Sequence, residues 1–392
     1  MRGSTAGIAE NFKIGGTAYH LLLSVMDSIF SAVVVAPLVV GYWRSVWELM
    51  NIYVYPDDKL LSALISTIIG ICGHLFFDIA QGFFTKRFHP DKNRIIYYVV
   101  SRAYTVAFAF VCVNGWKGPW NLLDQYTDPK DLTVVVVPFV IGIIALAVLR
   151  TLRNVSAPPF AIATDHVEEY FVVMTMFRIK MAEKTTLYVL DCIFSVLVVG
   201  TLVVFVWRGA WVLLDDFLFP ESASLSAWCS LVIGYLAVGL AFLLQPVMRW
   251  VCDRLQGGLR LIAADIFLLF SLFGTVNVWR GIWTLLNLYF LPDNQEISCW
   301  ITHWICLILL VLLGCSNSLL VRGVYIDAEE PAGKCVIFPC YYLRLIFQQE
   351  RAKKIAKRLQ LDILAKRKQD IDNNIADINH MVHEKQPNNH VV

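Results

Sequence analysis

Ionisable side chains inside long apolar runs are the residues of this chain best placed to do chemistry. Asp27 and Asp191 lie about eight and six residues into their runs, and His74 and Asp78 share a helical face four residues apart. Charges within a bilayer cost free energy and are functional candidates by default. One interpretation is a proton or cation pathway through Asp27, Asp191, Asp265 and His74. The other is that these groups reach water or headgroups by snorkelling.

A second pair of charges occupies matching places in the chain. Arg102 and Asp265 each precede a tryptophan of a repeated motif by 14 residues. The exchange of base for acid predicts a buried ion pair between repeats, which is structural at least as often as functional. His303 stands alone in its apolar run.

Other patterns of reactive residues are missing from the sequence. It has no nucleophile elbow, phosphate loop, dinucleotide fingerprint or metal-spaced cluster, and its ten cysteines show no zinc spacing. We therefore expect no enzyme activity, no cofactor, no metal and no nucleic-acid partner.

The elements that must position these charges are marked by a motif that occurs four times. It reads Trp, a cation, two variable residues, Trp, any residue, Leu, an aliphatic residue, and Asn or Asp, and it holds eight of the 12 tryptophans. An aromatic residue follows two positions later, and a proline follows 13 positions after the first Trp. The first tryptophans are Trp43, Trp116, Trp207 and Trp279, and the second are Trp47, Trp120, Trp211 and Trp283.

Two interpretations of this motif remain open. Tryptophans favour the membrane–water boundary, so the motif is typical of an interfacial anchor that ends a span. Alternatively, the four units ring a common axis and line an outer vestibule. The polar residue at the end of each motif then faces a pore or a partner; these residues are Asn51, Asp124, Asp215 and Asn287.

Composition identifies a polytopic membrane protein. The 392 residues are 57% hydrophobic and 16% charged, against about 25% charged in soluble domains. Several apolar runs exceed the ~18 residues that mark a membrane-spanning helix. We predict an all-α bundle of eight spans, built from four hairpins in two parallel halves. The spans are expected at 19–42, 60–83, 95–116, 132–150, 185–207, 226–248, 259–279 and 299–321.

Five segments follow from these spans. The interval from Trp43 to Trp207 equals that from Trp116 to Trp279 to within one position, so the two halves match. Parallel repeats are related by an axis along the membrane normal. The segments are a cytosolic N-terminus (1–18), a first membrane half (19–150), a cytosolic connection (151–184), a second membrane half (185–322) and a basic, partly helical tail (323–392).

Charge placement predicts the orientation. Loops after even-numbered spans are basic and loops after odd-numbered spans carry acids. Since cytoplasmic loops carry excess Lys and Arg, both termini are expected in the cytosol and the motifs on the outer face. The sequon at Asn154 would then stay unmodified.

Two cytosolic segments have special features. Residues 155–184 predict either a surface-lying helix or a plain linker. The tail from 348 to 381 looks helical, with a basic face suited to anionic lipid or a protein partner, or simply to water. Cys335 and Cys340 follow the last span and are weak candidates for palmitoylation.

The span count and the motifs around Trp207 and Trp279 resemble the fuseless family of animal transmembrane proteins, over about residues 19–325. The resemblance implies a non-catalytic role at the presynaptic plasma membrane in organising machinery such as calcium channels, with synaptic proteins as partners. An ion or small-solute transporter or channel, using acids within the spans, is the alternative that the residues suggest. The sequence does not determine the oligomeric state.

Overall fold

The fold is described by a computed structural model that covers residues 17–384 except 129–130, 168 and 328–333. Two compact units divide the chain, one up to Tyr341 and one from Tyr342 onward. All regular structure in the described residues is helical. The second unit is therefore shorter than the tail expected from residue 323, because residues such as Val324 and Val336 are buried in the first unit.

Seven helices of the first unit are long and apolar enough to cross a membrane, and α5 is a shorter apolar helix of 17 residues. Two of the seven contain a π-helical segment, η2 or η4, at matching positions. The elements are α1 (Thr17–Phe30), η2 (Ser31–Val35), α2 (Ala36–Tyr53), α3 (Lys59–Arg87), α4 (Arg94–Tyr126), α5 (Leu132–Val148), η3 (Leu152–Val155), α6 (Thr185–Phe194), η4 (Ser195–Gly200), α7 (Thr201–Phe217), α8 (Ala223–Arg254), α9 (Gly257–Tyr289), α10 (Gln295–Leu312) and η5 (Ser316–Leu319).

The tryptophan motif lies inside the helices and does not terminate them. Helices α2, α4, α7 and α9 run through it and end at its last aromatic residue: Tyr53, Tyr126, Phe217 or Tyr289. The expectation that each span closes at the first Trp was therefore wrong. Trp, Leu and Arg are compatible with a helix, and the breaking proline comes only in the following turn.

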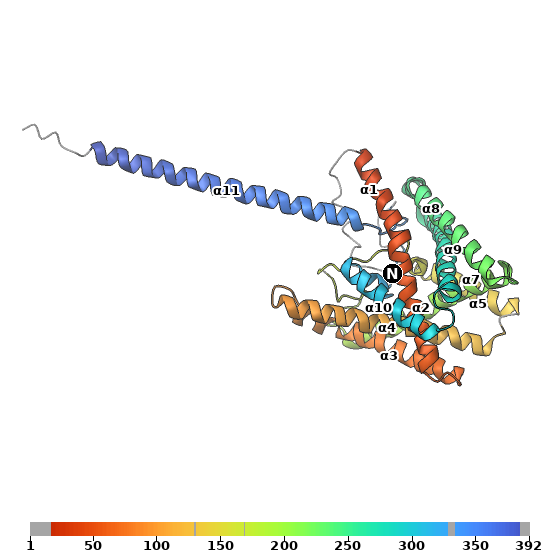
Figure 1. Ribbon diagram of the computed structural model, residues 1–392. Helices are drawn as coiled ribbons and strands as arrows, with labels where there is room; N and C mark the ends of the chain where they lie inside the picture. The colour runs from red at the N-terminus through yellow and green to blue at the C-terminus, as the bar shows by residue number, and fades with distance from the viewer. Residues whose placement is uncertain (1–16, 129–130, 168, 328–333, 385–392) are drawn as a thin grey trace, which may run out of the picture. The chain divides into compact units, whose positions relative to one another are not determined.

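Packing of these helices replaces the expected hairpins with an interleaved ring. The motif helices α2, α4, α7 and α9 form an inner ring, each contacting two of the others. The helix after each motif packs on the next motif helix around the ring: α3 on α4, α5 on α7, α8 on α9, and α10 back on α2 (Figure 1). The helix after each motif thus packs on the motif helix of the neighbouring repeat, and not on the motif helix of its own repeat.

Two irregular segments, named connectors here, are buried in this unit. Connector 1 (151–184) follows α5 and connector 2 (313–341) follows α10. Leu152, Val155 and Phe160 of connector 1 are fully buried. Connector 1 has no α-helix in its described residues, so the surface-lying helix, one of the two predicted alternatives, was wrong. The apolar residues that suggested it are used for burial inside the bundle.

The connectors hold each other reciprocally. Asp165 of connector 1 accepts hydrogen bonds from the backbone N–H groups of Ser316 and Asn317 in η5. Asp327 of connector 2 accepts them from Leu152 and Arg153 in η3. Each carboxylate therefore caps the short helix of the other connector. This pairing satisfies backbone N–H groups that burial would otherwise leave unpaired.

The second unit consists of α11 (Tyr342–Glu384), a helix of 43 residues. Its basic side chains between Lys353 and Lys368 are exposed, as are the apolar Ile355, Leu359 and Ile363. The helix predicted for the tail is confirmed, and it is longer than expected.

Helix-to-helix contact in the ring depends on glycine at a few close approaches. A Cβ on Gly281 of α9 would lie 2.8 Å from the backbone nitrogen of Leu231 in α8. A Cβ on Gly239 of α8 would meet nothing within 4 Å. Small residues at helix interfaces are how membrane helices approach closely.

We predict that Gly281→Ala lowers the unfolding temperature of the purified protein, because α8 and α9 must separate. The loss should correspond to about 1–3 kcal/mol, the usual cost of overpacking. Gly239→Ala is the matched control and should leave the melting curve unchanged or slightly raised. Equal melting temperatures for the two variants would contradict this packing.

Candidate functional site

The first tryptophans of the four motifs form a closed ring. Trp43 contacts Trp116 and Trp279, and Trp207 contacts the same two, with ring centroids 5.3–5.6 Å apart. All four contacts are edge-to-face, the geometry that aromatic quadrupoles prefer. We name this group the inner tetrad. Three of its four side chains are buried.

The second tryptophans form a parallel ring one helical turn away, named the outer tetrad. Trp47, Trp120, Trp211 and Trp283 make four edge-to-face contacts at 5.7–5.9 Å. The eight indoles and Glu48 line a cavity of about 170 Å³. This arrangement agrees with the interpretation of the motif as a ring around a common axis. The interfacial-anchor interpretation does not explain why the indoles contact each other.

The motif cations link each repeat to its neighbour. Arg280 donates to Asp215 at 2.7 Å, and Arg208 donates to Asp124 at 2.8 Å. Arg44 of the first repeat donates to Asn287 of the fourth at 2.6 Å, whereas Asn51 donates to Glu48 of its own motif. For each of these three arginines the acceptor is the polar residue that ends the neighbouring motif. Asp124, Asp215 and Asn287 therefore bind a cation between repeats, in place of the pore-facing role considered from the sequence.

A second polar position completes these links. A serine follows the first Trp at one constant spacing in three repeats, at Ser62, Ser226 and Ser298. Arg280 reaches Ser226 at 2.7 Å, Arg44 reaches Ser298 at 3.3 Å and Lys117 reaches Ser62 at 3.4 Å. The second repeat has Val135 at this place, and there Arg208 bonds to Thr127.

The indole N–H groups of the inner tetrad tie the ring to the connectors. Trp43 donates to the carbonyl of Leu319 at 3.1 Å, Trp207 to Val155 at 2.9 Å and Trp279 to Pro158 at 2.7 Å. Trp116 alone has no hydrogen-bond partner for its indole N–H among the described residues. Backbone carbonyls of the connectors therefore accept hydrogen bonds from three of the four indoles of the inner tetrad. Among the described residues, Trp116 lacks such a carbonyl partner.

Two of the intramembrane acids, Asp27 and Asp191, have protein partners. Asp191 accepts from the hydroxyl of Thr175 at 2.6 Å and from the backbone N–H of Phe177 at 2.9 Å. It is buried, and so is its counterpart Asp27, which also has an interaction partner. Asp191 thus anchors connector 1 to α6, and snorkelling to water does not describe either residue.

The predicted ion pair between Arg102 and Asp265 does not form. Arg102 instead contacts Asp165 of connector 1 at 2.9 Å. Asp265 is half-buried, and one of its carboxylate oxygens has no hydrogen-bond partner in the described part of the chain. The equal spacing from Trp116 and Trp279 predicted that Arg102 and Asp265 lie at equivalent positions in the two halves. Arg102 pairs instead with Asp165 of connector 1.

Burial affects the two carboxylates that join the connectors. It raises the pKa of Asp165 above its usual value, although Arg102 and the donors of Ser316 and Asn317 oppose the change. Burial likewise raises the pKa of Asp327, opposed by the N–H groups of Arg153 and Leu152.

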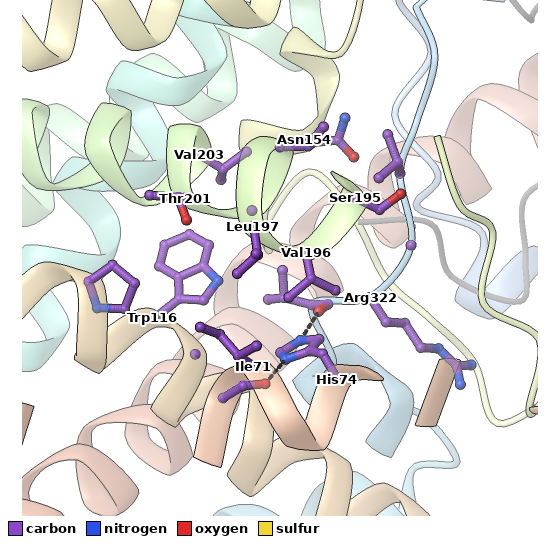
Figure 2. Close-up of a pocket in the computed structure, with 18 of the residues that line it drawn as sticks. Ile71, His74, Trp116, Asn154, Ser195, Val196, Leu197, Thr201, Val203 and Arg322 are labelled. Atoms are coloured by element: carbon purple, nitrogen blue, oxygen red, sulfur yellow. Dashed lines mark hydrogen bonds between the residues drawn. The ribbon is translucent and has the colours of Figure 1, made fainter. Parts of the chain in front are cut away.

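His74 and Asp78 line a cavity of about 460 Å³ between α3, α4 and η4 (Figure 2). His74 lies between two backbone carbonyls, those of Gly70 at 2.8 Å and Val321 at 3.4 Å. Asp78 is buried, and its Oδ1 has no partner among the described residues. His303 is elsewhere, against the ring of Tyr42.

Several residues that matter here were missed from the sequence. Asp165 and Asp327 lie in segments interpreted as cytosolic, where charged residues are common, and Arg322 is the last residue of the predicted second membrane half. The serines at a constant spacing after Trp carried a usable signal, since they repeat with the motif. Cys335 and Cys340 are buried, an environment that disfavours the palmitoylation suggested for them. Within the described residues no group of His, Cys, Asp and Glu is arranged to hold a metal.

These features define a polytopic α-helical membrane protein with internal repeats. The chain belongs to the Fuseless family, whose sequence profile matches residues 22–320. Comparison with curated proteins and with solved structures found no match.

The cation links give a paired prediction. Arg280→Lys removes a planar fork that contacts Asp215, Ser226 and Ser230, which lysine cannot reproduce. We expect a lower unfolding temperature, equivalent to about 1.5–3 kcal/mol for lost charged hydrogen bonds. The reciprocal variant, Lys117→Arg, gives the second repeat the cation of the other three. Thermal unfolding in detergent should show no loss for it, and a loss as large as that of Arg280→Lys would refute the repeat assignment.

Removal of the contacts that Asp165 makes should also destabilise the protein. Asp165→Ala leaves Arg102 without its acid and two buried N–H groups of η5 without an acceptor. We expect the equivalent of about 2–3 kcal/mol, measured as a lower unfolding temperature. The exposed Asp57 is the control, because Asp57→Ala should stay within about 0.5 kcal/mol.

Proposed function

We propose that this protein is a non-catalytic, multi-pass organiser of the presynaptic plasma membrane, which holds machinery such as calcium channels. Family membership and the apolar helices support the membrane setting. The presynaptic role is the one that the family resemblance implies.

The observation that carries this proposal is α11. It is a separate unit whose basic and apolar side chains are both exposed over several turns. An amphipathic helix with a basic face suits anionic lipid headgroups or the groove of a protein partner. Synaptic proteins and anionic lipid are therefore the partners that we propose.

The proposed topology has eight spans, with both termini in the cytosol. Helix α5, with 17 residues, is the eighth span in addition to the seven longer helices. It packs on α7 as α3, α8 and α10 pack on their motif helices. An even number of spans returns the chain to the basic side, which is the cytosolic side by the positive-inside rule.

The organiser function predicts separable roles for the two units. A chain ending at Tyr341 should insert into membranes but lose its ability to cluster calcium channels in synaptic terminals, measured by fluorescence imaging. Substituting Lys353, Lys354, Lys357 and Arg358 by Gln should weaken clustering if the partner is anionic. Normal clustering by the truncated chain would contradict the proposal.

A transporter or channel is the alternative function, because Asp27 and Asp191 are acids within spans. It predicts ion or solute flux in liposomes containing the purified protein, which the double variant Asp27→Asn, Asp191→Asn should lose. Since Asp191 also anchors connector 1, the variant's melting temperature must be measured beside its flux. Absence of flux across a broad panel of ions and solutes would favour the organiser.

A further inference from the structure

The cavity of about 460 Å³ is lined by residues of α3 from Thr67 to Asp78. Helix α3 in the first half corresponds to α8 in the second, with Gly70 matching Gly234 at the interval that separates Trp43 from Trp207. By the same interval, Ile71 of α3 corresponds to Tyr235 of α8. Ile71 lines the cavity, whereas Tyr235 is a half-buried residue at the equivalent place.

Tyr235 makes a specific contact there. Its hydroxyl donates to the carbonyl of Ala32, in the π-helical segment η2, at 3.1 Å. Ala32 corresponds to Val196 in η4, which lines the cavity beside Ile71 (Figure 2). Isoleucine has no hydroxyl to donate to Val196. The first half therefore lacks both the ring and the donor that the second half provides.

The polar lining differs between the halves in the same way. His74 and Asp78 line the cavity, while the corresponding residues of α8 are the apolar Val238 and Phe242. Trp116 lines the cavity with an indole N–H that lacks a partner among the described residues. Asp78 is 3% exposed, with an Oδ1 that no described residue contacts by a hydrogen bond. Buried polar groups are normally hydrogen-bonded, so the Oδ1 of Asp78 points to a missing partner.

We propose that this cavity binds a membrane sterol, or another rigid apolar molecule with one hydroxyl, in the place that Tyr235 occupies in the other half. The hydroxyl donates to the carbonyl of Val196, as the Tyr235 hydroxyl donates to Ala32. The apolar body contacts Ile71, Leu197 and Val203. This inference goes beyond the organiser function and does not depend on it.

Size and charge select this class of ligand. The volume of about 460 Å³ lies within the ~300–1,000 Å³ of small-molecule sites. The lining from Thr67 to Asp78 extends about 16 Å along α3 at 1.5 Å per residue. A phospholipid headgroup would bring a phosphate into a cavity where Arg322, the sole cation among its described lining residues, already donates to Tyr104.

The test uses the full-length protein in lipid nanodiscs and a sterol that carries a photoreactive diazirine on its apolar body. Mass spectrometry should locate the label on α3 and on residues 195–203. Ile71→Tyr copies the filled half and should reduce labelling about tenfold, equivalent to about 1.4 kcal/mol. Ile71→Val keeps the cavity open and should label like the parent. Equal labelling of Ile71→Tyr and Ile71→Val would overturn the proposal.

A second measurement tests the hydroxyl and requires no variant. Unlabelled sterol should compete with the probe, and the same sterol with a ketone in place of its hydroxyl should compete about fivefold less well, the value of one hydrogen bond. A ketone cannot donate to Val196. Equal competition by both would show apolar filling only, and stronger competition by a phospholipid would assign the cavity to an acyl chain. Either result would refute the sterol assignment.

Discussion

Edge-to-face contact between tryptophans of neighbouring repeats is the interaction on which this structure depends. Each such pair contributes about 0.5–1.5 kcal/mol beyond its buried area. The geometry of a tetrad fixes where four helices can stand, because each indole must present an edge to one neighbour and a face to another. Two tetrads, one helical turn apart, also fix how each helix is rotated about its axis. The ring closes only when all four motif helices are present.

The interleaved packing follows from this closure. The helix after each motif packs on the next motif helix, and the motif cation reaches back across the same interface. Lone buried charges are costly, so a cation whose acceptor lies in another repeat stabilises only the assembled ring. The irregular connectors obey the same constraint. Their non-helical backbone is buried in protein, and the indole N–H groups of the inner tetrad donate hydrogen bonds to its carbonyls.

Helix positions and the repeat were predictable from the sequence because both depend on local pattern. Apolar runs, turn prolines and the spacing of tryptophans locate α2 to α10 closely. The ends of the motif helices were misplaced, since hydropathy falls at Trp and Arg before the helix itself ends. The packing partners of each helix were not predictable, because packing α3 on α4 instead of on α2 leaves every local sequence pattern unchanged.

The burial of the connectors was not predictable for a related reason. Charges such as Arg153 and Asp165 are typical of solvent-exposed segments, and only the reciprocal capping of η3 and η5 explains their burial. The candidate acids stood out as unusual residues, but their partners did not, because backbone N–H donors such as that of Phe177 carry no side-chain signal.

Departures from the repeat are more informative about binding than the repeat itself. Positions that keep their residue type in both halves, such as Gly70 with Gly234 or Ser62 with Ser226, serve packing that both halves require. Where the types differ in a cluster, the common architecture no longer explains the choice. Ile71, His74 and Asp78 differ together from Tyr235, Val238 and Phe242, and they line one cavity. In the second half Tyr235, Val238 and Phe242 take these positions, so the fold itself does not require His74 and Asp78. Their retention in one half therefore requires a cause outside the fold, and a bound hydroxyl-bearing molecule supplies the ring and the donor that the filled half provides for itself.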